Sequence, residues 1–161
     1  MRRPLLLAAP LLFLLAGCAC RGPAPLLKVT TGPDPIPALA EALADGGLQT
    51  RAFDDDSLII SRDHLNVVVF VEDQGESLQA VLPCTRAGEA DAGRVARWNA
   101  TRRFGRAYLD EDGRPTLASD LLVTSGLGAR DVVAWGRLTL DMAWAFVDEV
   151  WPRPQGAPVN E

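Results

Sequence analysis

The stretch from Trp98 to Gly113, WNATRRFGRAYLDEDG, gathers the side chains of this chain that are best suited to chemistry. Arg102, Arg103 and Arg106 could bind the carboxylates of an acidic partner, because guanidinium groups present paired N–H donors. An acidic turn, Asp110–Asp112, follows closely, and opposite charges on a hairpin often pair with each other. We expect such structural pairings, and we keep the three arginines as candidates for partner binding.

Three aromatic rings in the same stretch alternate with polar residues. We predict that Trp98, Phe104 and Tyr108 are buried between a helix and a sheet. Asn99 lies near the end of the expected helix, where its amide can satisfy backbone groups. Gly105 permits close packing or a bulge. These residues favour a mainly structural role for the stretch.

The other candidates for catalysis or metal binding are isolated. His64 is the only histidine and has no serine or cysteine close in sequence, so we expect it to be solvated. The run Asp54–Asp56 lacks the spaced oxygens and the glutamate of a calcium loop, and we expect it to end a strand. Motifs for a serine nucleophile, a phosphate loop or a dinucleotide are missing from the sequence. We therefore expect no cofactor, no metal and no catalysis. An enzyme whose carboxylates and arginines meet only in space is the alternative.

The amino terminus carries a targeting signal. Arg2 and Arg3 precede an apolar run, Pro4–Ala16, that is shorter than the about 20 residues a membrane-spanning helix needs. This pattern predicts a secretory signal peptide over residues 1–17.

The end of this signal, Leu15-Ala16-Gly17-Cys18, resembles the lipobox of bacterial lipoproteins. The resemblance implies that the Cys18 thiol carries diacylglycerol, that cleavage precedes it, and that the new amino terminus is acylated. Two or three acyl chains together give stable anchoring in a membrane. Ala19 follows, where Asp would favour the inner membrane, so in a cell with two membranes we expect an anchor in the outer membrane, facing the periplasm. The alternative is an ordinary cleaved signal with a cysteine nearby.

The net charge and the cysteines further limit the kinds of partner and the chemistry that this chain can have. Without residues 1–17, 14 basic and 21 acidic residues remain, so the net charge is −7. This balance argues against a nucleic-acid partner. Cys20 and Cys84 could oxidise to a disulfide after export, and the sequence leaves this pairing open.

A Pro/Gly-rich linker, residues 18–33 with the lipidated end, leads into one domain over residues 34–152, and residues 153–161 form a tail. Asp34 and Pro35 can start a helix that Gly46 and Gly47 end. Period-two runs then predict strands, and a second helix, a hairpin turning at Asp112-Gly113 and a long third helix follow. The expected fold class is α+β, an antiparallel meander plus hairpin packed by helices. The expected elements, in chain order, are a helix from Asp34, the strands QTRAF, LIISRD, LNVVVFVED and SLQAVLPC, a helix over Ala90–Thr101, a hairpin over Arg102–Val123 and a helix over Ala129–Trp151.

Two of these elements have more apolar surface than one contact needs. In the strand LNVVVFVED, Val68 and Phe70 oppose the valine face, so we expect this strand to be central and covered on both sides. In the long helix, Leu140 and Trp144 widen the apolar stripe and Trp151 extends it. The helix is either thoroughly buried or has a second contact, with a partner or in a homodimer.

The segment RWNATRRFGRAYLDEDGRPTL resembles the central segment of the YbjN domain family, a bacterial group described as sensory transduction regulators. The resemblance covers about Asp34 to Trp151. It implies a fold like that of type III secretion chaperones, an antiparallel sheet with helices on it, often dimeric. Two features depart from the family. Gly128 stands where a capping hydroxyl is usual, which leaves Asp131 to meet the helix dipole, and most members carry no lipid anchor.

These features together predict a lipid-tethered, chaperone-like module that holds a peptide or another envelope protein. Its sheet or the outer face of its long helix would provide the surface. The residues we assign to partner binding are Leu140, Trp144, Trp151, Arg102, Arg103 and Arg106.

Overall fold

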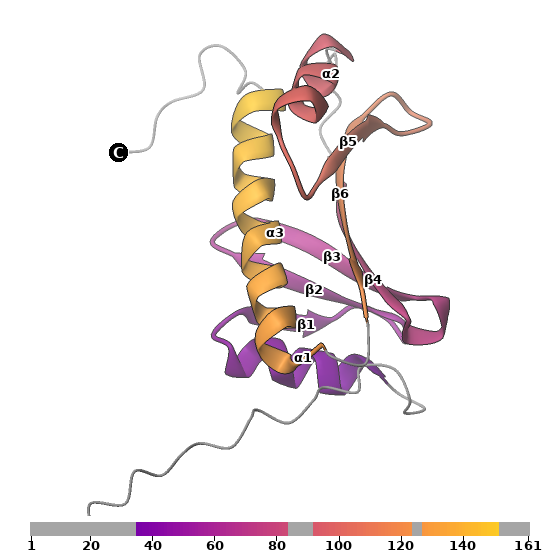
Figure 1. The fold of residues 1–161 in the computed structure, drawn as a ribbon, viewed down its shortest axis with the longest axis vertical. Coiled ribbons are helices and arrows are strands. Elements are labelled where there is room, and N and C mark those ends of the chain that lie inside the picture. The colour runs from indigo at the N-terminus through magenta and orange to yellow at the C-terminus, as the bar shows by residue number, and fades with distance from the viewer. Residues whose placement is uncertain (1–34, 84–91, 124–126, 152–161) are drawn as a thin grey trace, which may run out of the picture.

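A computed structural model of the chain describes residues 35–83, 92–123 and 127–151 (Figure 1). The described residues form helices and strands in the predicted order. They are α1 (Pro35–Asp45), β1 (Gln49–Ala52), β2 (Ser57–Arg62), β3 (Leu65–Glu72), a 3-10 turn η1 (Asp73–Gly75), β4 (Ser77–Pro83), α2 (Ala92–Thr101), β5 (Arg106–Leu109), β6 (Pro115–Leu122) and α3 (Ala129–Val150).

The strands form one antiparallel sheet in the order β1-β2-β3-β4-β6-β5. Strands β1 to β4 follow one another as a meander because short turns join them. The β5–β6 hairpin then pairs with β4 through β6, which leaves β5 at one edge and β1 at the other. The predicted class, α+β with a meander plus a hairpin, is confirmed.

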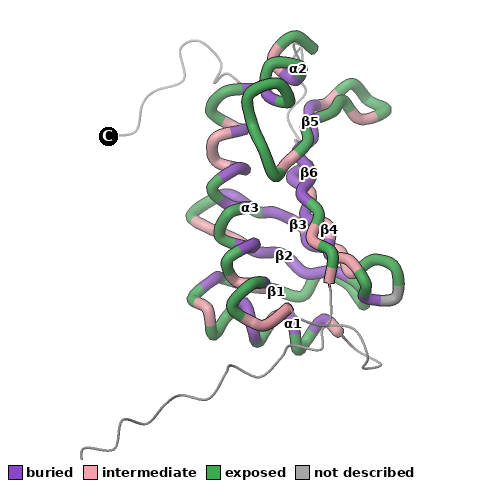
Figure 2. Tube along the Cα trace, viewed as in Figure 1, coloured by how far each residue is buried: buried purple, intermediate pink, exposed green. Residues whose placement is uncertain are grey.

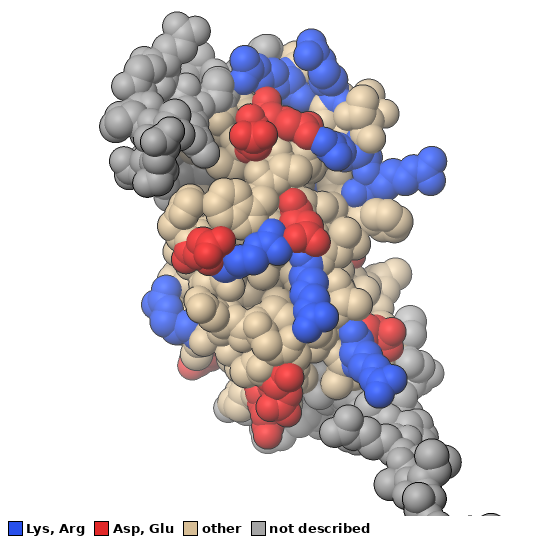
Figure 3. Space-filling view, turned by 90° about the vertical axis from the view of Figure 1, so that its left-hand side faces the viewer, with Lys and Arg blue, Asp and Glu red and all other residues tan. Residues whose placement is uncertain are grey.

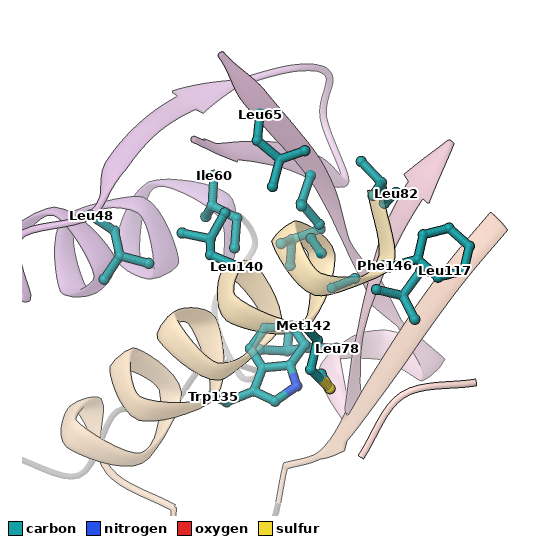
Figure 4. Packing of buried hydrophobic residues seen from close by; sticks show 14 of the residues in the cluster. Leu48, Ile60, Leu65, Leu78, Leu82, Leu117, Trp135, Leu140, Met142 and Phe146 are labelled. Carbon is teal, nitrogen blue, oxygen red and sulfur yellow. The ribbon is translucent and has the colours of Figure 1, made fainter. Parts of the chain in front are cut away.

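The described helices lie on one face of the sheet, where they share a single core with the inward side chains of the strands (Figures 1 and 4). On β3 the inward positions Leu65, Val67 and Val69 are buried, as the alternation predicts. Figure 2 shows buried positions along β2, β3 and the side of α3 that faces them. Because helices α1, α2 and α3 and strands β2 to β6 all contribute to this core, residues 35–151 contain the core that the domain needs to fold.

The turns follow the predicted chemistry. Gly47 adopts a φ of +82° in the turn after α1, and Gly113 adopts a φ of +73° in the β5–β6 turn. Both angles favour glycine, which has no Cβ to clash. At the start of α3 the N–H of Gly128 donates to the Asp131 carboxylate at 2.9 Å, so Asp131 partly replaces the missing cap.

The prediction that β3 is covered on both sides is wrong for the described residues. Val68 and Phe70 point to the face opposite the helices, and both are only half-buried. The interpretation failed because periodicity reports which residues are apolar, and says nothing of what covers them.

Several predictions lie outside the described residues. These are the signal peptide 1–17, lipidation at Cys18, the linker 18–33, a Cys20–Cys84 disulfide and the tail 153–161. Among the described helices, none has the length and apolar character to cross a bilayer.

Candidate functional site

One end of the domain is basic although the chain carries a net charge of −5. Residues 92–109 contain five arginines and no acidic residue. Helix α2 packs against β5 and α3, which brings this segment together at one end of the molecule. Figure 3, a view from the α3 side, shows several basic side chains at that end, with acidic side chains between them. Such a local field would attract an acidic partner.

The arginines at this end pair with different elements. Arg102 forms an ion pair with Glu149 of α3, and its guanidinium lies 5.4 Å from the centre of the Trp98 ring. Arg106 is 3.8 Å from Asp120 across the β5–β6 hairpin, and both side chains are at least half exposed. Arg103 has no ion pair with any residue that the structure describes. The expected pairing with the acidic turn is therefore not seen for these arginines: Arg106 contacts Asp120 of β6 across the hairpin, and Arg102 pairs with the long helix.

The acidic turn is satisfied by a different arginine. Arg114 donates its Nε–H to Asp110 at 2.9 Å and also pairs with Asp112. Asp110 also accepts the backbone N–H groups of Asp112 and Arg114. The backbone N–H of Arg114, followed by its side chain, holds the pKa of Asp110 below the usual value. The turn is thus closed locally by Arg114 and does not engage Arg103 or Arg106.

Asn99 has the backbone role that its position predicts. Its Nδ2 donates to the carbonyl of Ala107 and its Oδ1 accepts the N–H of Ala107, both at 2.8 Å. Ala107 lies on the edge strand β5, so Asn99 occupies backbone groups that another strand would otherwise use. This arrangement protects the edge against strand addition.

Phe104 is the residue where the structure departs most from the sequence-based prediction. Its ring is 75% exposed, and its backbone adopts a φ of +68°, which is rare for an aromatic residue. Trp98 is buried as predicted, at 2% exposure, and Tyr108 is 40% exposed. The prediction of three buried rings is therefore correct for Trp98 and wrong for Phe104 and Tyr108.

The backbone at Phe104 is held from beneath. Ser119 of β6 donates its hydroxyl to the carbonyl of Phe104 at 2.9 Å, and the Trp135 indole N–H donates to Ser119 at 3.3 Å. Gly105 fits close against β6 and α3, since a Cβ there would lie 3.2 Å from Leu117 Cδ1 and from Met142 Sδ. Gly105 takes the inward position, and the left-handed turn directs the Phe104 ring outward. Figure 2 shows the exposed connection between α2 and β5.

A sequence signal for this outward placement exists. In an extended segment, Phe104, Arg106 and Tyr108 lie on one face, and Gly105 and Ala107 lie on the other. An arginine seldom points into a core, so the face that carries Arg106 is the solvent face. The positive φ of Phe104 has no comparable signal in the sequence.

The candidate residues of α3 lie in different environments. Leu140 is 3% exposed and belongs to the core, as Figure 4 shows, so it supplies no free surface. Trp144 and Trp151 are half-buried. Trp144 packs edge-on against the exposed His64, with ring centres 5.0 Å apart, and its indole N–H is buried without a partner in the described part of the chain. Most of the apolar stripe is thus core, which matches the alternative of a thoroughly buried helix.

The remaining candidates hold turns. Asp54 accepts hydrogen bonds from the Ser57 hydroxyl and from the N–H of Asp56, so the acidic run shapes the β1–β2 turn. The hydrogen bond from Ser57 lowers the pKa of Asp54, and the neighbouring Asp54 raises the pKa of Asp56. Within residues 35–83, 92–123 and 127–151, no three His, Cys, Asp or Glu side chains are grouped so as to hold a metal ion.

Two solved structures with TM-scores above 0.5 share this fold, and a third is similar to it. The HopA1–SchA chaperone–effector complex has a TM-score of 0.52 at 13% identity and covers 66% of this chain and 88% of its own. The crystal structure of YbjN from E. coli has a TM-score of 0.51 at 16% identity, with coverage of 70% and 90%. The Yersinia pestis type III secretion chaperone SycH, in complex with a fragment of YscM2, has a TM-score of 0.48 at 18% identity, with coverage of 66% and 94%.

Sequence comparison identifies the family. No match is found among curated protein sequences. The sequence model named YbjN, with the description "Putative bacterial sensory transduction regulator", matches residues 35–150, which is most of the chain and the whole of the described fold. The chain therefore belongs to the YbjN family.

Proposed function

We propose that this protein is a lipid-anchored member of the YbjN family in the bacterial cell envelope that binds another protein or a peptide and performs no catalysis. The observation that carries this proposal is the exposed ring of Phe104 on a left-handed backbone. An exposed apolar ring is unfavourable in water, and the backbone conformation adds a further cost. Both costs are offset when the ring enters a pocket on a partner.

The surroundings of Phe104 fit a protein-binding surface. Aromatic residues and arginine are enriched among residues that dominate binding energy, and Arg103, Arg106 and Tyr108 are all exposed beside Phe104 in the chain. A neighbour in fold is the chaperone of a chaperone–effector complex. This likeness supports protein binding as the kind of activity to test.

In-cell photo-crosslinking tests the binding proposal directly. A photoreactive phenylalanine analogue is placed at position 104 of the full chain, and the matched control places it at Leu138, an exposed apolar residue of α3. We expect a discrete covalent adduct with one protein from position 104 and none from position 138. Equal adducts from both positions, or none from position 104, would contradict the proposal.

Membrane anchoring rests on the sequence at Cys18 and has its own test. In cells fed a clickable fatty acid, the wild-type chain should be labelled and Cys18→Ser should not. Cys20→Ser is the matched control, because it removes a neighbouring thiol and should keep the label. Labelling that persists in Cys18→Ser would contradict lipidation at this residue.

A further inference from the structure

The face of the sheet opposite the helices carries a continuous row of side chains across all strands. The pairing registers place Arg51 opposite Ile59, Ile59 opposite Val68, Val68 opposite Val81, Val81 opposite Ala118, and Ala118 opposite Arg106. The row is therefore apolar in its centre and ends in an arginine on each edge strand. Phe70 lies in the next row, between Ser57 and Gln79. We name the five apolar residues the outer patch: Ile59, Val68, Phe70, Val81 and Ala118.

The outer patch is separate from the core of the domain. None of its five residues belongs to the core cluster that the described helices and strands share. Val68, Phe70 and Val81 are half-buried, and Ile59 and Ala118 are buried, at 6% and 1% exposure. An antiparallel sheet that faces water normally has polar residues on that side. An apolar patch bounded by charged residues is typical of a binding surface.

We propose that the outer patch binds a segment of another protein that presents apolar side chains between two acidic groups, which Arg51 and Arg106 engage. This inference rests on the proposed function and adds the surface and the chemistry of the partner. Arg51 is exposed and has no ion pair with any described residue. Among the described residues, Arg106 has only the long, exposed contact with Asp120, which a closer carboxylate can replace.

The charges at the two ends select against a second copy of this chain. Two copies packed face to face along the row would bring arginine against arginine at both ends, and like charges across an interface are unfavourable. A segment with acidic groups at its ends has the complementary arrangement. Asn99 also occupies backbone groups at the β5 edge, so a partner at this edge would bind the face of the sheet and would not add a strand.

The spacing of the strands sets the size of the segment. Five inter-strand spacings separate β1 from β5, which at about 4.8 Å each gives roughly 24 Å between the two arginines. A helix spans this distance in about 16 residues and an extended strand in about seven. The Arg106 end is continuous with Tyr108 on the same strand face and with Phe104 just before β5, so one partner can cover the patch and the Phe104 ring together.

Charge reversal with defined peptides tests this proposal on the domain of residues 35–151. Two fluorescent 18-residue amphipathic peptides with the same apolar face are used as probes, one with glutamates at both ends and one with lysines. Anisotropy titrations should show the glutamate peptide binding about tenfold more tightly. The double variant Arg51→Glu/Arg106→Glu should reverse this preference. Equal binding of the two peptides, or a preference that survives the double reversal, would overturn the proposal.

Variants of the patch itself separate the possible occupants. Val81→Asp should abolish binding of both peptides, and the control Leu138→Asp, on exposed α3 surface, should leave it unchanged; circular dichroism checks that both variants fold. A dimer in sedimentation that Val81→Asp dissociates would assign the patch to self-association and overturn the proposal. Adsorption to phosphatidylglycerol vesicles that Val81→Asp abolishes would assign it to the membrane, with the same consequence.

The peptide experiment and the crosslinking experiment test different proposals, so a negative result in one does not imply a negative result in the other. An adduct from position 104 without any peptide preference keeps protein binding and removes the outer patch from it. Peptide preference without an adduct from position 104 contradicts the role of Phe104 in cells and leaves the patch proposal standing.

Discussion

At the residue scale, Phe104 combines an exposed ring with a backbone conformation that glycine adopts more readily. Phe104→Gly should relieve the unfavourable φ and raise the free energy of unfolding by about 1 kcal/mol, because the ring makes few contacts within the chain. Urea unfolding of the domain measures the change. A loss of stability would show that the ring supports the fold.

Asn99 is the second residue whose role can be isolated. Asn99→Ala removes both hydrogen bonds to Ala107 and should lower the free energy of unfolding by about 1–3 kcal/mol. It should also promote association through the opened β5 edge. Asn99→Asp keeps only the acceptor and should have an intermediate effect. Unfolding and light scattering measure the two consequences, and equal stability of all three proteins would contradict the edge-protecting role.

The pKa shift of Asp110 predicts a pH dependence for the β5–β6 turn. The pKa of this carboxyl is lowered from 3.8 in the folded chain, so its stabilising contribution is present above the unfolded value. The contribution is lost as the pH falls through the lower folded value. In an NMR titration, the amide signals of Asp112 and Arg114 should shift with a midpoint below 3.8, and Asp110→Asn should remove this transition. A midpoint at or above 3.8 would contradict the hydrogen bonds at this turn.

At the element scale, Trp98 is the largest buried side chain that α2 contributes to the core. Trp98 packs edge-on against Phe146 of α3, with ring centres 5.2 Å apart. Trp98→Ala should therefore cost about 3–5 kcal/mol of stability, as truncation of a buried aromatic ring does. Chemical denaturation with Tyr108→Ala as the control measures this cost. A similar small loss in both variants would show that α2 is not anchored by Trp98.

The elements were predictable because their periodicity reflects one strong requirement, which is to place apolar side chains on a shared core. The alternation in β3 and the helical stripe around Trp135 and Phe146 both follow this rule. Asn99 and Gly105 were predictable for a related reason, since small and amide side chains have few alternative roles beside a strand.

The candidate site was less predictable because its features depend on contacts distant in sequence. The outward turn at Phe104 depends on Ser119 and Trp135, which follow 15 and 31 residues later. The outer patch becomes visible only when the strand registers place its members side by side. Leu140 was assigned to a partner surface because it lies at the margin of the apolar stripe, but its side chain is buried in the core.

At the scale of the whole molecule, the helices stabilise the fold, and we assign binding to the outer patch. The helices cover one face of the sheet and build the core, while the opposite face carries the half-buried Val68, Phe70 and Val81 and the basic end exposes Phe104. A lipid anchor on Cys18, joined through the linker 18–33, would hold this surface close to the membrane. Such tethering raises the local concentration of an envelope partner without any additional contact.

The central claim is that this domain binds a protein through the Phe104 end and the outer patch. The most direct measurement is the affinity of the partner captured by crosslinking from position 104, determined by calorimetry with the wild-type domain, Phe104→Gly and Val81→Asp. We predict that each variant remains folded and weakens binding at least about tenfold, as loss of a dominant contact does. Unchanged affinity in both folded variants would contradict the account.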